Sequence, residues 1–176
     1  LEADGGGRSL TRVLPAEWGH DAASWVAADP TLDIVTAYVD VVINEVLGST
    51  AGADSEYVEL YGIPGTSLEG LSIIVVESDA IASNGAIDKR IDLGAGDSLG
   101  DNGYFLLANG LAEDAYGVVA NLSIADNTIE NSSYTIALVE TASLSGSVVG
   151  GSEIVLDAVG VTDGGPSDSF FFNAPV

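Results

Sequence analysis

Four aspartates in two glycine-containing loops are the side chains of this sequence best suited to metal chemistry. They are Asp97 and Asp101 in residues 94–103 (GAGDSLGDNG), and Asp163 and Asp168 in residues 163–168 (DGGPSD). Carboxylate oxygens beside flexible glycines could bind calcium, but neither loop follows the EF-hand spacing. Ordinary turns are the favoured interpretation, and calcium binding is the alternative.

Catalytic chemistry has little support in this sequence. His20 is its single histidine, cysteine is absent, and no G-x-S-x-G segment supplies an activated serine. No P-loop or dinucleotide-binding motif is present, and the glycines lie in turns rich in serine and aspartate. We therefore predict a non-enzymatic protein without catalytic residues or a cofactor.

Composition limits the partners. The 176 residues include 27 acidic and 4 basic side chains, a net charge of −23. Such a surface repels the phosphate backbone of nucleic acids, so nucleic-acid binding is disfavoured. The hydrophobic content of 47% is sufficient for a folded core. The longest apolar runs, such as residues 71–76, have the length of a strand, so we predict no membrane insertion.

Strands must position these side chains, because a period of two dominates the hydrophobic pattern. Residues 41–46 and 56–61 predict a hairpin, in whose second strand Val58 and Leu60 share one face. The continuous apolar run of residues 71–76 predicts a strand that is covered on both faces.

Further strands and turns follow along the chain. Turn residues recur at the spacing of a β-sandwich, and only residues 111–116 suggest a short helix. Three consecutive phenylalanines, Phe170 to Phe172, indicate strand core. Further strands are expected at residues 87–93, 104–108, 134–139 and 153–159.

The hairpin also carries a family resemblance. The order INEV (residues 43–46), EYVELY (residues 56–61) and LEGL (residues 68–71) resembles the opening of the lamin-tail domain family, in its extracellular bacterial and archaeal form. The resemblance implies an all-β, immunoglobulin-like β-sandwich and an extracellular or cell-surface location. By itself it implies no enzyme.

The closing motifs of that family stand at the wrong end of this chain. Residues 7–13 (GRSLTRV) and 25–31 (WVAADPT) resemble the end of a lamin-tail domain, yet they precede its opening strand. We therefore predict an N-terminal closing segment (residues 1–33), a short linker (residues 34–40) and a lamin-tail-like body (residues 41–176).

A sandwich without its closing strand exposes an unpaired edge. The N-terminal segment could fill that edge in its own body, in a neighbouring molecule, or in the next unit of a tandem array. A connection of residues 33–40 spans at most about 26 Å when fully extended. That is short for a return along a whole sandwich, so a neighbouring molecule is favoured.

Our first hypothesis is a structural protein that polymerises head to tail. The N-terminal segment of one subunit completes the β-sandwich of the next by strand addition, so the partner is the protein itself. The predicted interface residues are Leu10, Arg12, Val13, Trp18, Trp25 and Val26. Two alternatives are a non-catalytic accessory or binding module of a secreted nuclease or phosphoesterase, and a calcium-dependent adhesin domain.

Overall fold

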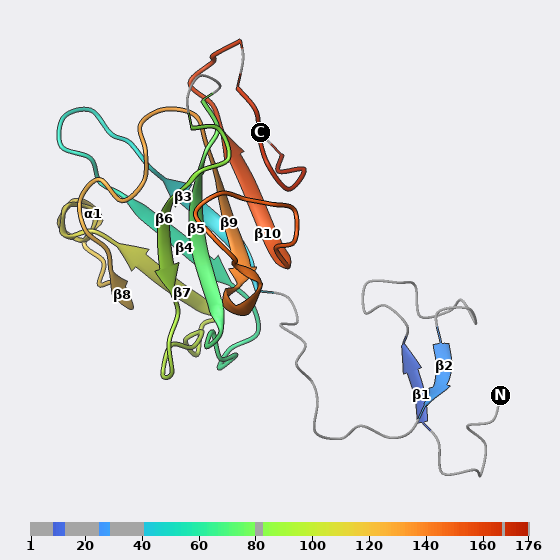
Figure 1. Ribbon diagram of the computed structural model, residues 1–176. Coiled ribbons are helices and arrows are strands. Elements are labelled where there is room, and N and C mark those ends of the chain that lie inside the picture. The colour runs from blue at the N-terminus through green and yellow to red at the C-terminus, as the bar shows by residue number, and fades with distance from the viewer. Residues whose placement is uncertain (1–8, 13–24, 29–40, 80–82, 167, 176) are drawn as a thin grey trace. The chain divides into compact units, whose positions relative to one another are not determined.

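The protein divides into two units. The computed structural model describes residues 9–12, 25–28, 41–79, 83–166 and 168–175. Contacts between residues separate Leu1–Ala37 from Tyr38–Val176, and this division falls within the predicted linker. In the first unit, β1 (Ser9–Arg12) and β2 (Trp25–Ala28) form a two-stranded antiparallel sheet (Figure 1).

The second unit consists of two packed four-stranded sheets (Figure 1). Its strands are β3 (Val42–Leu47), β4 (Tyr57–Tyr61), β5 (Leu71–Glu77), β6 (Ile87–Asp92), β7 (Tyr104–Ala108), β8 (Leu122–Ser123), β9 (Tyr134–Glu140) and β10 (Val155–Val161). One sheet has the order β10-β9-β5-β6 and the other the order β3-β4-β7-β8. Only the β7–β8 pairing is parallel among the pairings of the described strands. The predicted all-β sandwich is confirmed.

The main core lies between the two sheets. The predicted hairpin is the β3–β4 pair, and the alternation of β4 points Val58 and Leu60 inward, where both are fully buried. From the facing sheet, Ile73 of β5 and Ile136 and Leu138 of β9 are fully buried as well. Inward-facing aliphatic side chains from both sheets thus make one continuous core.

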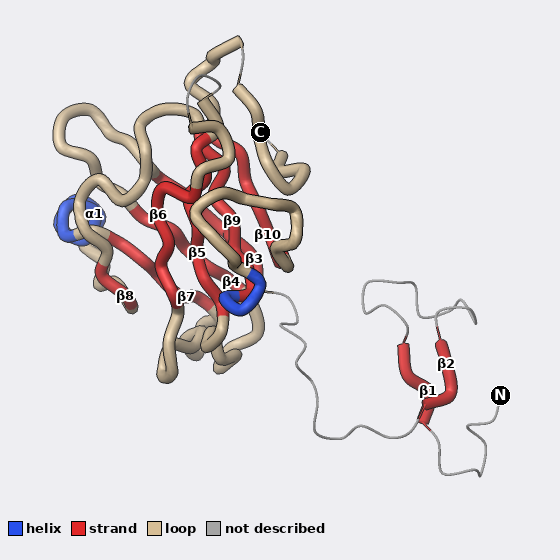
Figure 2. Tube along the Cα trace, in the orientation of Figure 1, coloured by secondary structure: helices blue, strands red, loops and turns tan. Residues whose placement is uncertain are grey.

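The outer face of the β10-β9-β5-β6 sheet carries a second apolar cluster. Ile74 of β5 and Val139 of β9 are fully buried there, beneath partly buried Val149, Phe171 and Phe172. The prediction that residues 71–76 form a strand covered on both faces is therefore confirmed. The covering chain is mostly loop (Figure 2).

The expectation that the phenylalanine triplet forms strand core was wrong. Residues 170–172 belong to an irregular C-terminal segment, and Phe172 has a positive φ of 61°. Two of the three rings still pack on the sheet, as members of the second cluster. The apolar content of the triplet was therefore a sound guide to burial but not to backbone conformation.

The predicted short helix is confirmed as α1 (Gly110–Tyr116). The Asn109 side chain accepts a hydrogen bond from the Ala112 amide and caps the first turn, and Gly117 ends the helix with a φ of 66°. A 3₁₀ turn, η2 (Thr141–Ser143), follows β9. Among the described residues, no helix is long and apolar enough to cross a membrane.

Candidate functional site

Two sheet edges meet on one flank of the sandwich. β3 is the last strand of one sheet and β10 the last strand of the other. The Ile43 amide of β3 donates a hydrogen bond to Asp157 Oδ2 of β10 over 2.8 Å. We call this flank the β3–β10 seam.

Asp157 blocks the seam by bonding to both edges. The pairing of β10 with β9 shifts register between Val155 and Asp157, which marks an irregularity of the bulge type. The second carboxylate oxygen of Asp157 accepts the Ala158 amide over 2.9 Å. One charged side chain thus occupies amides of two neighbouring edges, a common means of preventing unwanted strand pairing.

The two edges of the seam differ in how much backbone covers them. Beyond Asp157, the Gly160 amide of β10 donates to the Pro175 carbonyl over 2.7 Å, so the C-terminal segment lies against this edge. Within the described part of the chain, β3 makes backbone–backbone hydrogen bonds only with β4. The outer edge of β3 is therefore the less covered of the two.

The edges of the opposite flank are poorer sites for strand addition. β8 has only two residues. Four of the six residues of β6 are charged: Asp88, Lys89, Arg90 and Asp92. Its first amide, that of Ile87, also donates to the Ser147 carbonyl over 2.8 Å. Charged side chains protect an edge strand from pairing with another strand. β3 has only one charged residue, Glu45, and is therefore less protected than β6.

The predicted interface residues lie partly in the described strands of the first unit. Leu10 and Arg12 belong to β1, and Trp25 and Val26 belong to β2. In the register of this pair, Arg12 is opposite Trp25. Val13 and Trp18, the other two predicted interface residues, lie outside the described residues. The predicted closing strand is therefore one half of a two-stranded ribbon.

The calcium candidates fall into two separate turns. Asp97 Oδ2 accepts the Gly94 amide over 2.7 Å within its own loop, and Asp101 lies in the following turn. Asp163 and Asp168 come together: Ser133 Oγ donates to Asp168 Oδ2 over 2.6 Å and lies 3.1 Å from Asp163 Oδ1. In the described ranges, no group of three or more His, Cys, Asp or Glu side chains is arranged to hold a metal.

The hydrogen bonds explain the compact Asp163–Asp168 turn. Besides Ser133, the Thr162 hydroxyl donates to Asp168 Oδ2 over 2.8 Å, and the Gly165 amide donates to Asp163 Oδ1 over 3.0 Å. The Ser133 hydrogen bond is the main cause that lowers the pKa of Asp168. These carboxylates therefore hold the turn together.

A buried carboxylate that the sequence analysis did not identify lies beside the core. Glu56 is fully buried, and its two oxygens accept the Thr128 amide over 3.1 Å and the Ile129 amide over 3.2 Å. Burial raises the pKa of Glu56, although the two amides oppose that shift. Glu56 thus fastens the start of β4 to the chain before β9.

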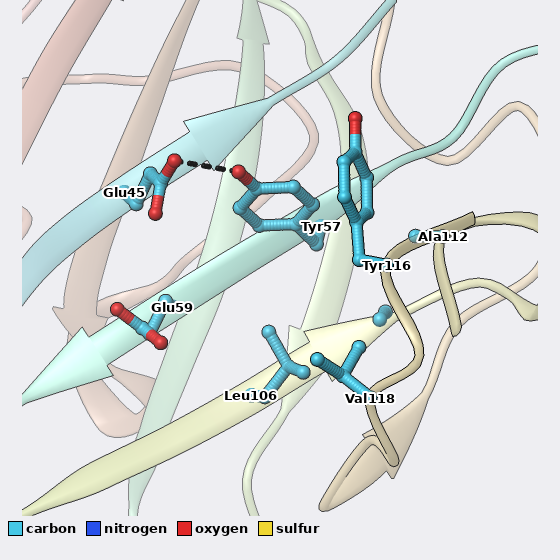
Figure 3. Close-up of a pocket in the computed structure, with 8 residues that line it drawn as sticks. Glu45, Tyr57, Glu59, Leu106, Ala112, Tyr116 and Val118 are labelled. Atoms are coloured by element: carbon cyan, nitrogen blue, oxygen red, sulfur yellow. Dashed lines mark hydrogen bonds between the residues drawn. The ribbon is translucent and has the colours of Figure 1, made fainter. Parts of the chain in front are cut away.

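An open pocket of about 230 Å³ lies between α1 and the outer face of the β3-β4-β7 sheet (Figure 3). It is lined by Glu45, Tyr57, Glu59, Leu106, Ala108, Ala112, Tyr116 and Val118. Tyr57 Oη donates to Glu45 over 2.6 Å, and the Tyr57 and Tyr116 rings meet edge to face with centroids 5.9 Å apart. Burial, followed by the hydrogen bond to Glu45, raises the pKa of Tyr57 to about 12. Tyr57 therefore remains a hydrogen-bond donor at neutral pH.

Comparisons of the chain with protein-family models, curated proteins and solved structures found no match. The assignment to the lamin-tail family therefore stays a prediction from the sequence motifs.

Proposed function

We propose that this protein is a non-enzymatic, extracellular structural subunit that assembles head to tail. The N-terminal unit of one molecule adds to the β3 edge of the next and completes its sandwich. The observation that carries this proposal is the contrast between β3, whose backbone pairs only with β4 among the described residues, and the charged β6 edge.

Strand addition would satisfy the backbone of both partners. An added strand would supply the main-chain hydrogen bonds that an edge strand lacks, and side chains on alternate positions would supply specificity. β1 and β2 already pair with each other, so a two-stranded ribbon is the unit that we expect to be donated.

In the free subunit, Asp157 would occupy an amide of the acceptor edge and so hinder strand addition. An incoming backbone must displace the carboxylate from the Ile43 amide, because one amide hydrogen makes one strong bond. Displacement returns a charged side chain to water, so the exchange costs little. The Asp157 carboxylate would hinder non-specific strand pairing while leaving the edge available to the N-terminal unit of another subunit.

The proposal is tested by light scattering during size-exclusion chromatography. We expect the full chain to form assemblies and a chain that begins at Val41 to remain monomeric. A peptide of residues 1–33 should stabilise the shortened chain, since a ligand of the folded state raises its melting temperature. A monomeric full chain at all concentrations would contradict the proposal.

A substitution at the edge gives a control within the full chain. Val42 of β3 is 39% exposed, and Val42→Lys places a charge on the acceptor strand. Val119→Lys makes the same change at a loop position that is 85% exposed. The first variant should assemble less than the second, and equal assembly would argue against β3 as the acceptor.

A further inference from the structure

We propose that the pocket between α1 and the outer face of the β3-β4-β7 sheet binds the guanidinium group of an arginine side chain, presented by a peptide segment of a partner protein. This inference goes beyond self-assembly and does not depend on it. It rests on the carboxylates, rings and apolar floor of the pocket.

Two like charges lie side by side at the pocket. Glu45 of β3 and Glu59 of β4 are directly opposite each other in the strand register, and both line the pocket. Like charges in opposite positions destabilise a sheet, so this pair has a cost that a bound cation would remove. A cation between them would interact with both carboxylates at once.

No basic side chain of the described residues of the second unit forms a salt bridge with these two glutamates. Its salt bridges involve Lys89 with Asp88 and Arg90 with Asp92, all on β6 of the other sheet. The hydrogen-bond donors to the pocket carboxylates are neutral: Tyr57 Oη to Glu45, and Asn44 Nδ2 to Glu59 Oε1 over 2.7 Å. Each bond involves one carboxylate oxygen, and within the described residues the other oxygen is left for a ligand.

The remaining walls of the pocket are aromatic and aliphatic. The Tyr57 and Tyr116 rings stand at 82° to each other beside the two carboxylates, and Leu106 and Val118 line the apolar side of the pocket (Figure 3). Aromatic faces attract cations, and an apolar surface accommodates an aliphatic stem. The pocket thus offers a surface for both parts of a long basic side chain.

Guanidinium fits this arrangement better than ammonium. Its planar group stacks on aromatic rings and presents several N–H donors in one plane, so it can bond to two carboxylates simultaneously. It is also less strongly hydrated than a lysine ammonium and loses less on leaving water. The net charge of −23 further favours a cationic partner over a neutral or acidic one.

The test is an NMR titration of the full-length Val42→Lys variant, which is expected to assemble less and is unchanged in the pocket lining, with N-acetyl-arginine amide at constant ionic strength. The matched ligand is N-acetyl-citrulline amide, which has nearly the same shape without the charge. We expect saturable shifts of the Glu59, Tyr116 and Val118 amides with the arginine compound only. Equal shifts with citrulline, tighter binding of N-acetyl-lysine amide, or no saturation would overturn the proposal.

Paired variants separate the pocket from general charge attraction. Glu45→Gln combined with Glu59→Gln removes both pocket carboxylates and should weaken binding by about tenfold. Asp79→Asn combined with Asp101→Asn removes the same charge at exposed positions outside the pocket lining and should leave binding unchanged. Equal weakening in both pairs would mean non-specific attraction and would contradict the proposed site.

Stability provides the control for folding. Replacing the glutamates removes a like-charge pair, so the double glutamine variant should melt no lower than the unmodified protein. Tyr116→Ala should also weaken binding, because it removes one of the two rings. If binding persists unchanged in both variants, arginine does not occupy this pocket.

Discussion

Asp157 Oδ2 accepts the amide of Ile43 across the seam between the two sheets, over 2.8 Å. The same carboxylate also accepts the Ala158 amide through its other oxygen, over 2.9 Å. A single side chain therefore links an edge of one sheet to an edge of the other. This hydrogen bond closes the seam at Ile43, and in the proposed assembly an added strand would have to displace it.

Replacing Asp157 by alanine should destabilise the sandwich. Two partly buried amides lose their acceptor, and each unsatisfied group costs about 1–3 kcal/mol unless water replaces it. We expect a fall of a few degrees in melting temperature. Asp101→Asn, which removes the same charge in a turn, should change stability by less than about 0.5 kcal/mol. Equal melting of the two variants would show that the seam contact contributes nothing.

Gly48 should not tolerate a side chain. A Cβ at this position would lie 2.5 Å from Tyr134 Oη and 2.7 Å from Ile129 Cγ2, so Gly48→Ala must displace packed atoms. We expect a loss of about 1–3 kcal/mol in the free energy of unfolding. The control is Gly110→Ala at the start of α1, where a Cβ meets no atom within 4 Å. Chemical denaturation should show this control to be neutral or slightly stabilised.

Glu56 gives a dependence of stability on pH. Burial raises its folded-state pKa above the ordinary value of 4.5, so its favourable contribution is complete below about pH 4.5. That contribution is lost as the pH rises through the folded-state pKa. Glu56→Gln cannot titrate at this position. As the pH rises, the free energy of unfolding of the unmodified protein should therefore fall relative to that of the variant.

Other carboxylates do not obscure this comparison. Asp54 and Asp92 have lowered pKa values, mainly through hydrogen bonds to the Thr50 amide and to Arg90 respectively. Their contributions to the free energy of unfolding are lost on acidification. Asp92 is present in both proteins and cancels in the difference. Repulsion between Asp54 and Glu56 does not cancel, but it raises the pKa of Glu56 as burial does and so adds to the expected shift. Denaturant unfolding between pH 3 and pH 7 measures the difference in the free energy of unfolding between the unmodified protein and Glu56→Gln. A difference that shifts toward the unmodified protein with rising pH would mean that the Thr128 and Ile129 amides outweigh burial.

The sequence predicted those features of the fold that depend on local periodicity. The alternation of β4 predicted burial of Val58 and Leu60, and the apolar run of β5 predicted cover on both faces. The short helix at residues 111–116 was also predicted, and Asn109 and Gly117 define its ends. Each of these patterns can be read within a dozen residues.

Features that depend on distant pairing could not be predicted. Glu56 bonds to amides 72 and 73 residues further along the chain, and no local pattern distinguishes it from a surface glutamate. Asp157 lies at a register shift of β10 and bonds to Ile43 of the other sheet, and neither feature has a signal of period two. The pocket likewise required the β3–β4 register that places Glu45 opposite Glu59.

Calcium should have little specific effect on this protein. Asp163 and Asp168 already bond to Ser133 and to neighbouring groups, and Asp97 bonds to the Gly94 amide. We expect calcium to raise the melting temperature no more than magnesium at equal ionic strength, because both screen the net charge of −23. A larger, saturable shift with calcium would support the adhesin alternative.

Cross-linking between differently labelled full-length chains tests the proposed assembly most directly. The chain has no cysteine, so single thiols can be introduced in separate preparations as Thr11→Cys in β1 and Val42→Cys in β3. After mixing, a short thiol-to-thiol reagent should join these two chains in much higher yield than Thr11→Cys with Asp88→Cys on β6. Equal yields, or linkage only within a chain that carries both Thr11→Cys and Val42→Cys, would contradict donation of the N-terminal unit to a neighbouring β3 edge.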